Sequence, residues 1–179
     1  MYGQDIKWKR ELLTVDNATL VNSFTCGIDY LNFGEYLYDI ALDDQDARTY
    51  VYIDVEKNKI FAYAALSCTV LMFEDSGSNA DYSPAILIDK FIVDEDYRGM
   101  PFSDSESDTL SQAILADVID TAEQISKTVI GAKYIVLYST KRAHQFYKNC
   151  GIKDFDEESM TPTTNQADKD DCKPMYWLI

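Results

Sequence analysis

The chain has 179 residues, of which 46% are hydrophobic and 26% are charged. This length and composition predict one folded domain over residues 1–179 and exclude a disordered chain. Sixteen basic residues against 31 acidic ones give a net charge of −15, which disfavours nucleic acid and anionic membranes as partners and favours cationic ones. Acidity that serves only to keep the protein in solution is the alternative interpretation.

Alternating and helical spacings of apolar residues predict a mixed α/β fold with helices on both faces of a sheet. The expected strands, in chain order, are Ile6–Leu13, Arg48–Val55, Ile60–Phe73, Ala85–Val93, Lys133–Tyr138 and Met175–Ile179. The expected helices are Thr14–Phe24, Asp29–Ala41, Asp108–Ser126 and Lys141–Cys150. Thr14 or Asp16 is expected to cap the first helix, Asp108 or Ser107 the third, and Gly151 follows the last as a C-terminal residue.

Cysteine, histidine and hydropathy patterns exclude several classes of protein. Cys26, Cys68, Cys150 and Cys172 are widely spaced without a CxxC pair, and His144 is the only histidine, so no metal site is expected. The cysteine spacing favours reduced thiols. No signal core or membrane-spanning apolar run occurs, so we expect no membrane partner and a cytoplasmic location.

Motif searches exclude the commonest nucleotide sites. Neither a GxxxxGK loop nor a GxGxxG loop is present, so a P-loop and a Rossmann dinucleotide site are not predicted. A serine or cysteine nucleophile paired with histidine would require His144. That residue falls with Lys141 and Lys148 away from the apolar stripe of its helix, which favours a surface position.

The segment from Phe91 to Gly99 is the first indication of a binding site. A strand ends at Val93, an acidic turn follows, and Arg98-Gly99 leads toward the helix that begins near Asp108. Backbone N–H groups at a helix N-terminus bind phosphate, and an arginine assists them. From this segment alone, a plain loop with one surface arginine fits equally well.

Four segments in order resemble the GNAT superfamily of acetyl-CoA-dependent N-acetyltransferases. FTCGIDYLN at Phe24–Asn32 is similar to the Phe-x-Cys-Gly opening of a toxin-like bacterial subgroup. TYVYID and IFAYAALS, which begin at Thr49 and Ile60, resemble its central hairpin, and IDKFIVDEDYRG from Ile88 resembles its fourth strand and pyrophosphate loop. AHQFYKNCGI from Ala143 resembles the family's C-terminal signature. The resemblance implies a GNAT-like, mainly antiparallel sheet of six or seven strands with about four helices.

The resemblance also implies a reaction and its residues. Acetyl-CoA would donate an acetyl group to a primary amine by direct attack, with Tyr147 as the general acid and Asp89 as a weaker candidate for the base. A core-packing role for Tyr147 and a salt bridge of Asp89 with lysine are the alternatives. The positions implied to bind the cofactor are Phe91, Ile92, Val93, Arg98, Gly99, Thr109, Leu110, Ser111 and Thr140.

One departure from the family pattern leaves the activity open. Residues Met100–Asp108 are inserted after Gly99, and Thr109 and Ser111 stand at the two glycine positions of the family loop. A GNAT-fold binding or regulatory module that has lost catalysis is therefore the alternative, followed by a domain that binds basic partners through its acidic face. Net charge favours a cationic amine acceptor over the aminoacyl-tRNA used by toxin-like relatives, unless a basic patch is concentrated locally, and a homodimer is left open.

Overall fold

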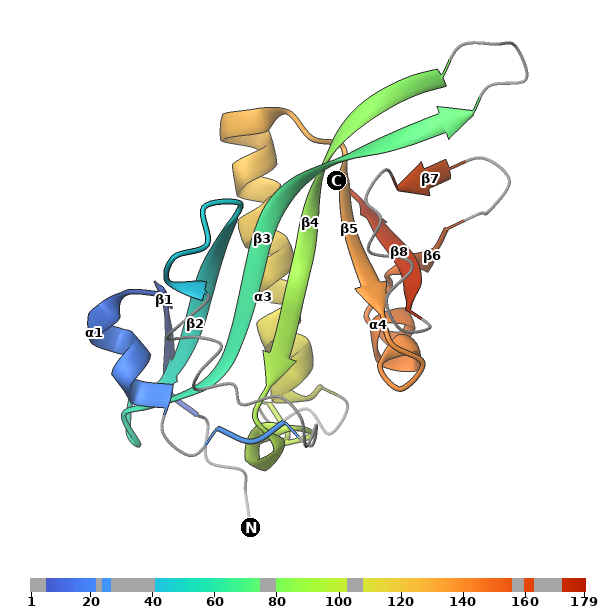
Figure 1. Ribbon diagram of the computed structural model, residues 1–179. Helices are drawn as coiled ribbons and strands as arrows, with labels where there is room; N and C mark the ends of the chain where they lie inside the picture. Colours follow the sequence, from blue (N-terminus) through green and yellow to red (C-terminus); the bar gives the residue numbers. More distant parts are fainter. Residues whose placement is uncertain are drawn as a thin grey trace. The chain divides into compact units, whose positions relative to one another are not determined.

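The protein is described from a computed structural model that places residues 6–21, 24–26, 41–74, 80–102, 108–155, 160–162 and 172–179. The expected helix at Asp29–Ala41 falls almost wholly outside this described part. Eight strands join one sheet in the order β1-β2-β3-β4-β5-β8-β6, with β7 on β3 (Figure 1). A mixed sheet was predicted, and this prediction is confirmed.

The strands are β1 Trp8–Leu12, β2 Ala47–Asp54, β3 Lys59–Glu74, β4 Ala80–Val93, β5 Tyr134–Ser139, β6 Lys153–Asp154, β7 Met160–Pro162 and β8 Lys173–Leu178. The α-helices of the described chain are α1 Val15–Ala18, α3 Leu110–Ile125 and α4 His144–Asn149. Short helical turns lie at η1 Thr19–Val21, η3 Glu95–Tyr97 and η4 Ser126–Ile130. Strand β4 pairs in parallel with β5, whereas the pairs β1–β2, β3–β7, β5–β8 and β6–β8 are antiparallel.

Two local expectations are wrong. Strand β4 begins at Ala80 rather than after Pro84, because the fixed φ of proline fits an extended strand and its carbonyl can still pair; the Pro84 carbonyl accepts the Lys133 N–H. Helix α3 is capped by Thr109 and not by Asp108 or Ser107. The polar segment after Ile152 contributes the short strands β6 and β7, because backbone pairing with a neighbour needs no apolar pattern.

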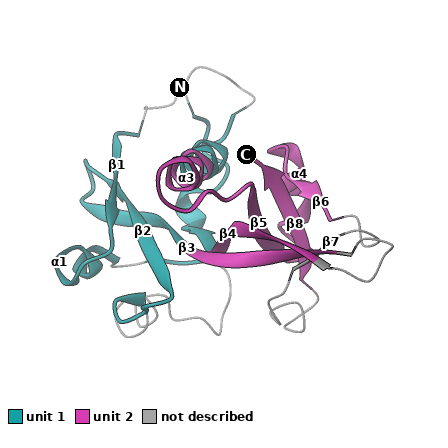
Figure 2. Ribbon diagram, turned by 90° about the horizontal axis from the view of Figure 1, so that it is seen from above, with its two compact units in different colours: residues 1–65, 90–118 teal, residues 66–89, 119–179 magenta. Residues whose placement is uncertain are grey.

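The chain divides into two compact units, coloured separately in Figure 2. Unit 1 comprises residues 1–65 and 90–118, and unit 2 comprises residues 66–89 and 119–179. Strands β3 and β4 and helix α3 each contribute residues to both units. The prediction of a single domain over 1–179 stays a prediction.

Unit 1 has a core that joins β2, β3 and the segment before the undescribed residues 27–40. Its fully or largely buried members are Cys26, Ala41, Val51, Ile53, Ile60 and Tyr63. Tyr52 lies at the other face, fully buried, and donates a hydrogen bond to Asp117 of α3 at 2.8 Å. Arg10 of β1 contacts the same carboxylate oxygen at 2.7 Å, so β1, β2 and α3 are joined through one acidic side chain.

Unit 2 has its own core between β3, β4, β5 and β8. Its buried members are Leu71, Ala85, Leu87, Val136 and Phe155. The register of β4 against β5 runs from Ala85 opposite Tyr134 to Ile88 opposite Leu137. No helix of the described residues has the length and hydropathy needed to cross a membrane.

Candidate functional site

The turn that follows β4 is organised by a buried carboxylate, Asp94. This side chain is fully buried and accepts the Asp96 N–H at 3.0 Å and the Thr25 N–H at 3.3 Å. Lys59 of β3 places its ammonium 3.0 Å from the same carboxylate. A buried carboxylate is stable only when it is paired and hydrogen-bonded, and Asp94 meets both conditions. No local pattern indicates this pair, because Lys59 and Asp94 lie in separate segments.

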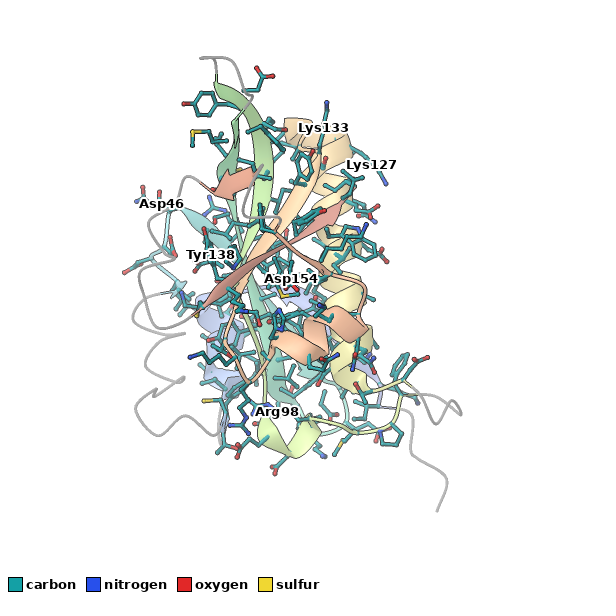
Figure 3. The ribbon with its side chains drawn as sticks, turned by 90° about the vertical axis from the view of Figure 1, so that its right-hand side faces the viewer. Asp46, Arg98, Lys127, Lys133, Tyr138 and Asp154 are labelled. Atoms are coloured by element: carbon teal, nitrogen blue, oxygen red, sulfur yellow. The ribbon has the colours of Figure 1, made fainter. Side chains whose placement is uncertain are left out.

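Arg98, which is labelled in Figure 3, was predicted to bind phosphate. Its guanidinium donates to two backbone carbonyls. Its Nε donates to the carbonyl of Val93, and its Nη2 donates to the carbonyl of Cys26, each at 2.8 Å. The remaining nitrogen lies 3.8 Å from a carboxylate oxygen of Glu95. These contacts make Arg98 a positioning residue of the turn, and its contact with a phosphate stays a prediction.

Together these contacts fasten the Phe24–Cys26 segment to the end of β4. The Glu95 N–H donates to the Thr25 carbonyl at 2.8 Å, and the Thr25 N–H returns a bond to Asp94. The segment that resembles the Phe-x-Cys-Gly opening and the segment that resembles the pyrophosphate loop are therefore joined by hydrogen bonds.

The predicted cofactor-binding residues of β4 continue past its pairing with β5. That pairing covers Ala85–Ile88, so Phe91, Ile92 and Val93 follow the paired stretch. Ile92 packs on the core of unit 1, and Val93 is buried. Gly99 has a φ of +69° and open space around its Cα, a backbone conformation that favours glycine.

Backbone hydrogen bonds join the two ends of the inserted segment where the loop meets α3. The Leu110 N–H donates to the Met100 carbonyl and the Phe102 N–H donates to the Asp108 carbonyl, each at 2.8 Å. Thr109 and Gln112 form a capping box: the Gln112 side chain accepts the Thr109 N–H at 2.8 Å, and the Gln112 N–H reaches the Thr109 hydroxyl at 3.4 Å. The pattern Thr-x-x-Gln was a readable signal that the sequence analysis missed.

Unit 2 holds the other predicted site residues, namely Tyr147, Thr140 and Asp89. Tyr147 of α4 is 7% exposed, and its ring packs against Phe146. Burial raises the pKa of the Tyr147 phenol, which keeps the hydroxyl protonated at neutral pH, as a general acid requires. Thr140 begins the turn into α4, accepting N–H groups of Ala143 and His144 on its carbonyl. Asp89 is half-buried on β4.

His144 lies near the surface, as expected, and its partly exposed side chain belongs to a cluster with Asp154 and Lys148. Its Nε2 lies 2.5 Å from Asp154 of β6, and the Lys148 ammonium lies 3.0 Å from the same carboxylate. His144 and Lys148 flank Tyr147 on α4, so their shared partner fastens the helix that carries the predicted general acid.

Comparisons with known proteins identify the fold. No family model matches the sequence, and no curated protein matches it either. Solved structures do match. A Tyr-to-Phe mutant of the toxin AtaT has a TM-score of 0.70 and 14% identity, over 99% of this chain and 94% of that one. AtaT complexed with acetyl-methionyl-tRNAfMet has a TM-score of 0.67 and 14% identity, over 96% and 95%.

A third structure, AtaTR bound with AcCoA, has a TM-score of 0.68 and 16% identity, over 96% of this chain and 93% of that one. The match thus runs along nearly the whole chain in each case, although few residues are shared. The mixed sheet of this protein is the GNAT-like fold that the sequence resemblance implied.

Proposed function

We propose that this protein is an N-acetyltransferase that moves the acetyl group of acetyl-CoA to a primary amine. The observation that carries the proposal is the fold match over almost the full length to a structure bound with AcCoA. The end of β4, its turn and the start of α3 supply the backbone groups that this fold would offer to the cofactor. None of the side chains in the described residues forms a metal-binding group, and the proposed reaction needs none.

The proposed chemistry assigns one step to each group. The amine nitrogen attacks the thioester carbonyl carbon, and a backbone N–H of Phe91–Val93 polarises the carbonyl oxygen. The carbon–sulfur bond then breaks, the departing thiolate takes the phenol proton of Tyr147, and the phenolate takes up the second proton that the nitrogen loses as it becomes an amide. Asp89 is proposed to accept the proton that the ammonium of the acceptor must lose. One of the matching structures is a Tyr-to-Phe mutant of AtaT, which supports the choice of a tyrosine as the proposed general acid.

Tyr147→Phe tests the mechanism directly. We expect the variant to bind acetyl-CoA as the native protein does and to lose about 10²- to 10⁴-fold in kcat. Tyr176→Phe is the matched control, since Tyr176 is a half-buried aromatic residue of the same unit that packs on Phe155 at 5.2 Å. Equal kcat values for native protein and Tyr147→Phe would exclude Tyr147 as the acid.

The acceptor has two candidates that differ in charge. The net charge of −15 favours a cationic amine. However, the described stretch from Ser139 to Phe155 contains Lys141, Arg142, Lys148 and Lys153 against one acidic residue, Asp154. Lys173 of β8 lies opposite Ser139 in the register. This local basic surface favours an acceptor that carries phosphates, and one matching structure holds an acetylated aminoacyl-tRNA.

We therefore propose an aminoacyl-tRNA as the second candidate acceptor, beside a small cationic amine. In the other basic cluster, on β1, Lys9 pairs with Glu11 and Arg10 with Asp117, just as Lys148 pairs with Asp154 in this one. Acetylation of charged tRNA that falls in an Arg142→Ala variant, with polyamine acetylation unchanged, would support the RNA acceptor. Acetylation of polyamines alone would support the cationic one.

The competing proposal is a binding module without catalysis, as the insertion after Gly99 suggests. It predicts no turnover of acetyl-CoA with any amine, whether or not the cofactor binds. A thermal melt with acetyl-CoA separates binding from its absence, because a ligand at a hundred times its Kd adds about 2.7 kcal/mol of stability. All four cysteines are thiols in the structure, and we propose the cytoplasm as the location.

A further inference from the structure

Three backbone N–H groups at the start of α3 already have acceptors within the chain. The Thr109 N–H is bonded to the Gln112 side chain, the Leu110 N–H to the Met100 carbonyl, and the Gln112 N–H to Thr109. A phosphate bound at a helix N-terminus requires these same N–H groups. Donors that a phosphate would use are therefore occupied by acceptors of the protein itself.

We propose that the Gln112 side chain and the Met100 carbonyl compete with the cofactor phosphates for the backbone N–H groups at the start of α3. The inference rests on the proposed function and adds regulation of the same site. Binding of the cofactor phosphates would require the Gln112 side chain to leave the Thr109 N–H, and the Met100 carbonyl to leave the Leu110 N–H. The affinity seen in solution is then reduced by the fraction of molecules in which the cap is open.

The inserted segment supplies one of the two competing groups. Pro101 and Thr109 form an antiparallel bridge, and the Phe102 N–H is held by the Asp108 carbonyl. These bonds set the Met100 carbonyl against Leu110. In a loop that ran directly from Gly99 into the helix, no such strand-like base would exist to present that carbonyl. The insertion thus acts on the cofactor through the hydrogen bonds at its base.

Arg98 does not offset this competition in the structure as it stands. Two of its nitrogens donate to the carbonyls of Val93 and Cys26, and the third lies near Glu95. The charge that would draw a phosphate to the loop is thereby turned toward the protein. While Arg98 is held in this way, its charge does little to draw a phosphate to the N–H groups that the cap occupies.

Calorimetric titration with acetyl-CoA tests the proposal on three variants. Gln112→Ala removes the acceptor on Thr109, and we expect its Kd for acetyl-CoA to fall about fivefold. Gln112→Glu keeps the capping box and adds a negative charge where phosphate binds, so its Kd should rise about two- to fivefold at low salt. Gln124→Ala, at an exposed glutamine of the same helix, should leave the Kd unchanged.

Thermal melting without ligand separates competition from a merely structural role. A lost cap lowers the melting temperature of Gln112→Ala, whereas its acetyl-CoA affinity should rise. A structural role alone predicts that both fall. Native protein that binds acetyl-CoA while Gln112→Ala binds it equally or more weakly would overturn the proposal. Absence of binding in every variant would overturn the proposed function as well, and binding gained only by Gln112→Ala would support both.

Discussion

The buried pair of Asp94 and Lys59 supports a large and specific prediction about stability. In Asp94→Ala, the Asp96 and Thr25 N–H groups lose their acceptor, and the Lys59 ammonium, with a side chain only 17% exposed, loses the carboxylate at 3.0 Å. Removing one partner of a buried ion pair costs about 3–5 kcal/mol. With a urea m-value near 2 kcal/mol/M, the unfolding midpoint should fall by about 2 M.

A double-mutant cycle measures the pairwise part of this cost. Urea unfolding is followed by circular dichroism for the native protein, Asp94→Ala, Lys59→Met and the double variant. We expect a coupling free energy of about 1–3 kcal/mol. Asp94→Asn should be intermediate, since it keeps an oxygen acceptor but loses the charge. A cost below about 1 kcal/mol for Asp94→Ala, with additive single variants, would refute the role given to this carboxylate.

Three further predictions concern the ends of the helices and an exposed ion cluster. The His144 hydrogen bond and the Lys148 ammonium hold the pKa of Asp154 below its ordinary value, so their stabilisation is present above the carboxyl's ordinary pKa and is lost as pH falls through the lowered one. Asp154→Asn should therefore destabilise by up to about 1 kcal/mol at pH 7, and this difference should vanish toward about pH 2; a difference that persists in acid would contradict it. Gly151→Ala should cost about 1–2 kcal/mol, because φ is +86° and the added Cβ would lie 3.1 Å from the Trp177 ring; a neutral effect on urea unfolding would show that the turn can relax. Thr14→Ala should cost about 1 kcal/mol, because the Thr14 hydroxyl accepts the Asn17 N–H; Thr14→Ser, which keeps the acceptor, is the control.

The regular elements were predictable because their signals are local. Apolar alternation located the strands that became β2, β3 and β5, and helical spacing located α3 and α4. The Thr14 cap and the positive φ of Gly151 followed from the chemistry of helix ends. Strands β6 and β7 were not predictable in this way, because they are short and polar and depend on partners distant in the sequence.

The site was only partly predictable, because its contacts join distant segments. Burial of Tyr147 fits both the role of general acid and the alternative of core packing, so its role stays a prediction. The direction of the Arg98 side chain did not follow from its place in a motif, since its acceptors are the carbonyls of Val93 and of Cys26, 72 residues away. A motif gives the residue type at a position, whereas the partner of a charged side chain is set by the backbone that folding brings beside it.

The same contacts give a physical reason for the Phe-x-Cys-Gly opening that prompted the resemblance. Cys26 is 4% exposed and packs in the core of unit 1, where a small apolar side chain fits. Its carbonyl faces outward to Arg98, and the neighbouring Thr25 exchanges backbone bonds with Asp94 and Glu95. A larger residue at position 26 would move the carbonyl and release the guanidinium. The opening therefore acts on the turn after β4 through its backbone, and packing in the core accounts for the small side chain at position 26.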